Sequence, residues 1–68
     1  MEKKENINKI IGENISKYRK QLDMTQIELA DHLNYSDKAV SKWERGEALP
    51  NMETLFEICE LFKIFLLV

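Results

Sequence analysis

The residues best placed to do chemistry lie in one short stretch, SDKAVSKWERG, which runs from Ser36 to Gly46. It contains three cations at spacings of four and three residues, Lys38, Lys42 and Arg45. Cations at helical spacing project from one side of a helix, where they can bind phosphates or the acceptor groups of bases. A charged helix face more often only contacts water. The surrounding elements must therefore decide between the two interpretations.

The sequence offers no comparable set of residues for catalysis or metal binding. Ser16, Ser36 and Ser41 lack the His–Asp arrangement that would activate a hydroxyl group. His32 is the only histidine, and no second imidazole or thiol stands at ligand spacing from it. Cys59 is the only cysteine, which suits a reducing cytoplasm and an inert packing role. We therefore expect no enzyme activity, no cofactor and no metal.

Length and composition indicate one small soluble domain spanning residues 1–68. The 68 residues are 44% hydrophobic and 32% charged, as in an ordinary globular protein. The net charge of −2 by itself argues against a nucleic-acid partner. Residues 51–68 account for that charge, because residues 1–50 are neutral overall. The local sign of the surface therefore depends on which side chains share a face.

The first two helices are predicted by apolar spacing and by capping residues. Thr25 with Glu28 three residues later forms a capping box for the second helix, which ends near Leu33. Asn34 then suits the left-handed conformation of a tight turn. The second helix should direct Ile27, Leu29, Ala30 and Leu33 toward its neighbours. A first helix over residues 6–22 is predicted by the spacing of Ile7, Ile10, Ile11, Ile15, Tyr18 and Leu22.

Two further helices follow, and the whole pattern is all-α with short connections. Ser36 is expected to cap a third helix from Asp37 to about Arg45, which Gly46 ends. Asn51 is expected to cap a fourth helix, after a loop that contains Pro50. The apolar residues of the fourth helix are Met52, Leu55, Ile58, Cys59 and Phe62.

The third helix has two distinct sides. Val40 and Trp43 form the apolar side, so we expect both in the core rather than stacked on a base. Two short helices joined by a tight turn, the second polar outward, form a helix-turn-helix, whose second helix enters the DNA major groove. The polar side consists of Asp37, Lys38, Ser41, Lys42 and Arg45.

The run TQIELADHLNYSDKAVSKWERGEALPNMETLFEICELF resembles the Xre family of bacterial and phage regulators, which includes the Cro and lambda-type repressors. The motifs TQxELA, SKWERG and LPxxETL occur in the family's order, and the resemblance covers residues 10–64. It implies a compact lambda repressor-like bundle of four to five helices with a core over residues 6–64. It also implies a DNA-binding transcriptional regulator, and we favour a repressor that acts as a homodimer.

The resemblance assigns structural roles to five residues. Ala30 matches a small residue where the second and third helices cross closely. Val40 and Trp43 match core residues that anchor the recognition helix. Arg19 and Glu44 match a buried pair that ties the first helix to the third, which would explain an acid on a helix that approaches phosphates.

The resemblance also assigns the DNA contacts. A lysine can donate to guanine O6 and N7, whereas Asp37 can either accept from cytosine N4 or only stabilise the start of its helix. Gln26 matches a phosphate clamp at a helix N-terminus. The base-reading positions are matched by Asp37, Lys38, Ala39 and Lys42, and the DNA-backbone positions by Thr25, Gln26, Ser41 and Arg45.

The chain departs from the family at its end, FKIFLLV, where an amphipathic fifth helix is common. Residues 65–68 form an apolar tail that is too short to span a bilayer. The tail is either a dimer contact, which we favour, or the beginning of a longer apolar segment. Two recognition helices about 34 Å apart would read successive major grooves. The alternative function is an antitoxin-like interaction subunit whose tail docks a partner protein.

Overall fold

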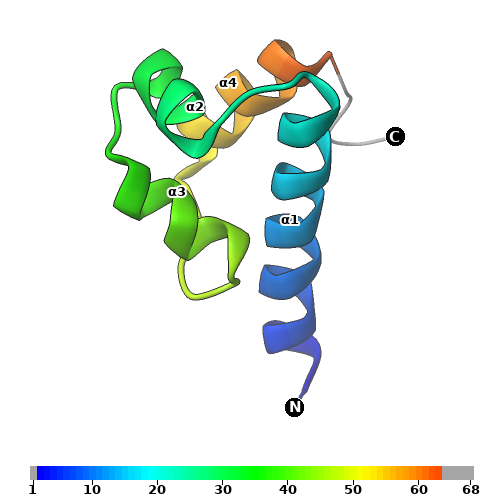
Figure 1. Ribbon diagram of the computed structural model, residues 1–68. Helices are drawn as coiled ribbons and strands as arrows, with labels where there is room; N and C mark the ends of the chain where they lie inside the picture. Colours follow the sequence, from blue (N-terminus) through cyan, green and yellow to red (C-terminus); the bar gives the residue numbers. More distant parts are fainter. Residues whose placement is uncertain (1, 64–68) are drawn as a thin grey trace.

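The computed structural model describes the backbone of residues 2–63 and the side chains of residues 7–63, so the apolar tail 65–68 lies outside the described residues. All regular structure within residues 2–63 is helical, as predicted. In Figure 1, α1 runs along one side of the molecule and faces the other three helices. The helices are α1 (Glu2–Gln21), α2 (Gln26–Leu33), α3 (Asp37–Glu44) and α4 (Met52–Phe62).

Helix α1 begins four residues earlier than predicted, and its apolar face is only partly covered. Ile15 is buried, and Ile11 and Tyr18 are half-buried against the core. Ile7 and Ile10, which belong to the same apolar period as Ile15, are each 54% exposed. The N-terminal end of α1 extends beyond α3 (Figure 1), and the loop after α3 approaches α1 at Lys9, where a Cβ atom at Gly46 would lie 3.1 Å from the Lys9 Cα. The helix ends at Gln21, one residue before the predicted end, and Leu22 is exposed.

The predicted capping box and turn of α2 are both present. The Thr25 hydroxyl accepts from the Glu28 backbone N–H at 3.0 Å, and the Thr25 N–H donates to the Glu28 carboxylate at 2.8 Å. Asn34 is left-handed, with φ of 60°, and its N–H donates to the Ala30 and Asp31 carbonyls. Ile27 is exposed, contrary to expectation, because it stands on the outer side of α2.

Helices α3 and α4 begin at the predicted caps. The Ser36 hydroxyl accepts from the Ala39 N–H at 3.2 Å, and the Asn51 side chain accepts from the Thr54 N–H at 2.8 Å. Helix α3 ends at Glu44, one residue before the predicted end, and Gly46 follows with φ of 76°. Met52 at the start of α4 is exposed rather than packed.

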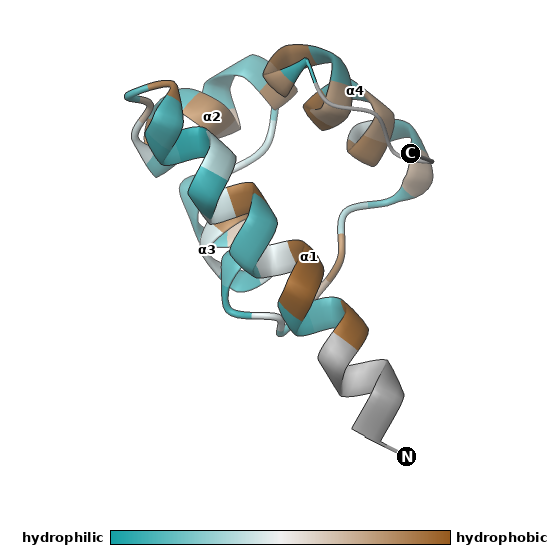
Figure 2. Ribbon diagram, turned by 90° about the vertical axis from the view of Figure 1, so that its right-hand side faces the viewer, coloured by the Kyte–Doolittle hydropathy of each residue, from teal (hydrophilic) through white to brown (hydrophobic). Residues whose placement is uncertain are grey.

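The core is formed where the four helices meet. Along α1, brown apolar and teal polar residues alternate, as expected of an amphipathic helix (Figure 2). Tyr35 in the turn after α2 packs edge-on against Trp43, with ring centroids 5.1 Å apart. The connected cluster of buried apolar side chains consists of Ile15, Leu29, Ala30, Leu33, Val40, Trp43, Ile58 and Phe62.

Candidate nucleic-acid interface

The orientation of α3 is fixed by two side chains on one side of the helix. Val40 is 0% exposed and Trp43 is 4% exposed, as their spacing predicted. Burial of an apolar side chain of this size contributes about 1.5–3 kcal/mol, so a rotation that exposed both would be strongly unfavourable. Ala30 on α2 is also buried, which allows α2 and α3 to cross closely.

A buried ion pair locks the end of α3 to α1. The Arg19 guanidinium donates to Glu44 from Nε at 2.7 Å and from Nη2 at 3.0 Å. Its Nη1 donates to the Met24 carbonyl at 2.7 Å. Gln26 Nε2 donates to Glu44 Oε1 at 3.0 Å, so the start of α2 joins the same network. These contacts hold α1, α2 and α3 in one fixed arrangement.

The Glu44 carboxyl group remains ionised in this buried setting. Burial by itself would raise the pKa of Glu44, but hydrogen bonds from Arg19 and Gln26 together with the Arg19 charge outweigh it and lower that pKa. The same hydrogen bond to Glu44 raises the pKa of Arg19. Both partners are therefore charged at neutral pH, and the acid at the end of α3 points inward.

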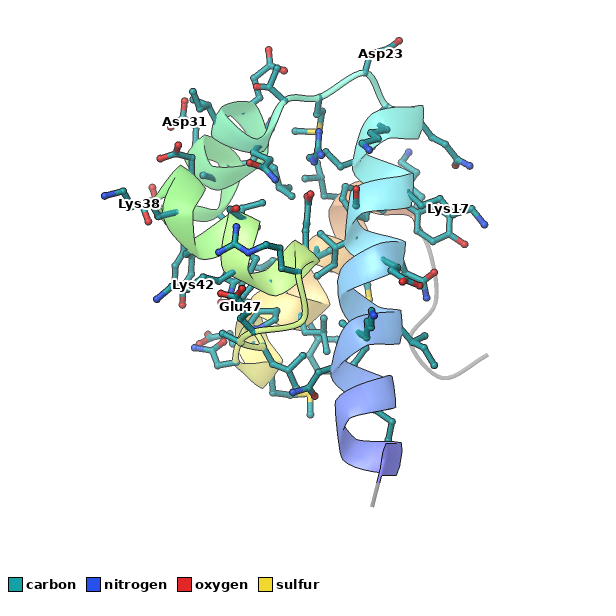
Figure 3. The ribbon with its side chains drawn as sticks, turned by 60° about the horizontal axis from the view of Figure 1, so that its bottom comes forward. Lys17, Asp23, Asp31, Lys38, Lys42 and Glu47 are labelled. Atoms are coloured by element: carbon teal, nitrogen blue, oxygen red, sulfur yellow. The ribbon has the colours of Figure 1, made fainter. Side chains whose placement is uncertain are left out.

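The opposite side of α3 presents the predicted base-reading residues to solvent. Asp37, Lys38 and Lys42 are exposed. Figure 3 shows Lys38 and Lys42 projecting from α3 on the side of the molecule opposite to Lys17 of α1. No ion pair joins either lysine to another residue among those described. Ala39 differs, because it is half-buried and packs against the core, so less of it faces outward.

The predicted backbone-contact residues flank this surface but are already hydrogen-bonded. Thr25 is exposed and caps α2, and Gln26 is half-buried with its amide directed to Glu44. Arg45 Nη1 donates to the Ser41 hydroxyl. Arg45 also donates to Glu47 from Nε at 2.9 Å and from Nη2 at 3.1 Å. Each of these residues therefore has an internal partner, and Ser41 and Arg45 lie within α3 and at its C-terminal end.

Two residues of this region were missed by the sequence analysis. A Cβ atom at Gly12 would lie 2.2 Å from the Trp43 carbonyl oxygen, so only glycine permits this close crossing of α1 and α3. An isolated glycine inside a helical pattern is a usable signal of such a contact. Glu47 was overlooked because the motif ends at Gly46, although an acid two residues after Arg45 can fold back on it.

Other chemistry is not indicated by the described residues. Within residues 7–63, no group of three or more His, Cys, Asp or Glu side chains is arranged to hold a metal ion. Cys59 is buried, and that burial raises the pKa of its thiol. None of the helices in the described part of the chain is both long enough and apolar enough to cross a membrane.

Comparison with known proteins agrees with this geometry. Residues 15–64 match the helix-turn-helix family. The chain is 40% identical over 53 residues to the transcriptional activator BcrR of Enterococcus faecalis, covering 78% of this chain and 26% of BcrR. It is 37% identical over 54 residues to the CTXphi repressor RstR of Vibrio cholerae, covering 79% of this chain and 48% of RstR. It is 34% identical over 55 residues to the antitoxin PezA of Streptococcus pneumoniae, covering 81% and 35%.

The chain spans less than half the length of each of these relatives. The match includes α2, the turn at Asn34, α3 and α4 in full. It also includes both partners of the buried Arg19–Glu44 pair. The chain therefore belongs to the helix-turn-helix family, as its resemblance to the Xre regulators implied.

Proposed function

We propose that this chain is a transcriptional regulator that binds double-stranded DNA through α3 and carries out no catalysis. The observation that carries the proposal is the burial of Val40 and Trp43, which turns Lys38 and Lys42 outward on one side of α3. A helix presented in this way fits the major groove, where lysine can recognise guanine. The names of BcrR and RstR, an activator and a repressor, support regulation of transcription. We favour repression by occupation of a promoter in the bacterial cytoplasm.

The proposal divides the contacts into two groups. Asp37, Lys38 and Lys42 would read bases, and Ala39 would add a smaller contact to a thymine methyl group. Thr25, Gln26, Ser41 and Arg45 would bind the sugar–phosphate backbone. For Gln26, one amide N–H is directed to Glu44, so the other would donate to a phosphate.

The experiment is selection of bound sequences from a random DNA pool, followed by affinity measurements on the selected site. Lys38→Ala should relax sequence preference at the base that Lys38 contacts, at a cost of about 1–3 kcal/mol on the preferred site. Gln26→Ala should weaken binding to all sequences alike. Lys17→Ala, an exposed lysine on the opposite side of the molecule in Figure 3, is the matched control.

Binding should also weaken steeply with salt. The logarithm of the binding constant should fall with the logarithm of the salt concentration, with a slope of about −0.9 for each phosphate neutralised. Absence of salt-dependent binding, or a Lys38→Ala variant with unchanged preference, would contradict the proposed interface.

A homodimer is part of the proposal, because one such domain reads only a half-site. Its support is a set of large apolar side chains left exposed on α1 and on the first half of α4, namely Ile7, Ile10, Met52 and Phe56. Exposed apolar surface of this kind is typical of interfaces. Ile10→Glu should lower the solution mass to that of one 8.1 kDa chain and weaken operator binding. Ile27→Glu, at an exposed apolar residue of α2, should leave the solution mass unchanged. A wild-type chain that binds the operator as a monomer would contradict the dimer.

A second candidate function is a protein-interaction subunit, which is supported by the similarity to the antitoxin PezA. The apolar tail or the exposed apolar residues of α1 would then dock a partner protein. Stoichiometric co-purification with the product of an adjacent gene, together with no selectable DNA sequence, would favour this candidate over the first.

A further inference from the structure

Glu47 forms a two-point contact with a residue proposed to bind DNA. Its two carboxylate oxygens accept from Arg45 Nε at 2.9 Å and from Arg45 Nη2 at 3.1 Å. A carboxylate bound side-on by a guanidinium has the same geometry as a phosphate bound by that group. Arg45 also donates from Nη1 to Ser41, so each of its three nitrogens has a partner. The protein thus supplies Arg45 with an internal substitute for phosphate.

The position of Glu47 next to α3 is fixed by the backbone. Its N–H donates to the Lys42 carbonyl at 2.9 Å, and the preceding residue, Gly46, bends the chain with φ of 76°. Figure 3 shows Glu47 close to Lys42 on this side of the molecule. The hydrogen bond from Arg45 lowers the pKa of Glu47, with smaller contributions from the charges of Arg45 and Lys42. The carboxylate is therefore negative at neutral pH, on the surface that would face DNA.

The cations proposed to contact DNA consequently differ in whether they form an ion pair within the protein. Lys38 and Lys42 make no ion pair with any described residue, whereas Arg45 is paired. Both side chains of the Arg45–Glu47 pair are more than half exposed, so a competing anion can reach them. We infer that Glu47 is a competing carboxylate that holds Arg45 in the free protein and lowers the affinity of the interface for DNA. This inference rests on the proposed function.

The physical consequence is an effect on affinity without an effect on sequence preference. A DNA phosphate must displace Glu47 from Arg45, and the released carboxylate then stays near the negative backbone. Removal of this negative charge would leave one more cation free to neutralise a phosphate. Because phosphate contacts carry no sequence information, preferred and unrelated DNA should gain affinity by the same factor.

The test is Glu47→Gln, which keeps the size of the side chain and removes its charge. Affinity for the selected site and for unrelated DNA should rise by up to about eightfold at 0.1 M salt, and the logarithmic salt slope should steepen by about 0.9. The matched control is Glu57→Gln, at an exposed glutamate on α4 that lines a hollow together with His32, and it should change neither quantity. Circular dichroism checks that all variants fold alike.

A second background shows whether the effect passes through Arg45. In Arg45→Gln, the further change Glu47→Gln should give a clearly smaller gain in affinity, since only the repulsion between the carboxylate and the phosphates is then relieved. A gain of the same size in that background would overturn the inference, because Glu47 would then act only as a general repulsive charge.

If the wild-type chain binds the selected site and the Glu47→Gln variant binds it no more tightly, the inference is overturned and the proposed function stays intact. If the wild-type chain shows no salt-dependent binding to DNA, the proposed function is overturned, and this inference with it.

Discussion

Two ion pairs of the same chemistry lie next to each other at the end of α3, and their environments differ completely. Arg19 and Glu44 are joined at 2.7 Å, with side chains 10% and 7% exposed. Arg45 and Glu47 are joined at 2.9 Å, with side chains 53% and 54% exposed. Neighbouring residues 44 and 45 thus belong to pairs that face opposite directions, one into the helix crossing and the other into solvent.

The difference shows that environment, rather than geometry, decides what an ion pair does. In the buried pair, Glu44 also accepts from Gln26, and Arg19 also donates to the Met24 carbonyl. Both side chains are at most 10% exposed, so little solvent can replace a lost partner and the pair is a fixed joint between helices. In the exposed pair, water and salt compete with each contact, so the partners can exchange. Only the second kind of pair can take part in binding an external phosphate.

The largest expected effect is from the loss of one buried partner. Glu44→Ala should lower the free energy of unfolding by about 3–5 kcal/mol, because Arg19 would remain charged and buried without its acid. Urea denaturation followed by circular dichroism measures this loss. Glu47→Ala is the control at the exposed pair and should unfold as wild type does. If Glu44→Ala and Glu47→Ala were equally stable, the distinction between the two pairs would be wrong.

A smaller loss is expected from crowding the same crossing. Gly12→Ala would place a Cβ atom 2.2 Å from the Trp43 oxygen and 2.9 Å from the Glu44 oxygen, so α1 and α3 must separate. We expect a destabilisation of about 1–3 kcal/mol, typical of overpacking, despite the better helix propensity of alanine. Asn14→Ala, at an exposed position of α1, controls for that propensity. A Gly12→Ala variant that is more stable than wild type would show that the helices do not meet here.

The next largest effect is a difference between the two pairs in how stability depends on pH. The pKa of Glu44 is lowered in the folded chain, so its contribution to stability is complete above the ordinary glutamate value of 4.5. The contribution is lost as pH falls from that value through the lower folded pKa. Urea midpoints measured between about pH 6 and 3 should fall less in Glu44→Gln than in wild type. Glu47→Gln should retain the wild-type profile, since solvent screens its pair.

Local features of the fold could be predicted from the sequence. The caps at Thr25, Ser36 and Asn51 and the left-handed turn at Asn34 each depend on a few neighbouring residues, and each is observed. The burial of Val40 followed from its spacing within a short helix. These features obey rules that operate within about one helical turn.

The rest depends on where distant elements end, which local patterns do not specify. The period of α1 identified its apolar side, but it did not reveal that α3 covers only part of that side. Ile7 and Ile10 are therefore exposed, although they satisfy the same spacing as Ile15. Similarly, the role of Glu47 depends on the bend at Gly46, which returns the chain toward Arg45.

The smallest expected effect concerns the stability of the exposed pair itself. Glu47→Gln should leave the midpoint of thermal unfolding unchanged, because both side chains of the pair are more than half exposed and water replaces the lost contact. Scanning calorimetry at low and high salt checks this, and the wild-type midpoint should respond to salt no more than that of the variant. A clear drop in the midpoint would mean that the pair holds the loop after α3 in place. Arg45 would then be too constrained to exchange Glu47 for a phosphate. An unchanged midpoint together with tighter DNA binding would place the whole effect of Glu47 on binding, while the neighbouring Glu44 acts on folding.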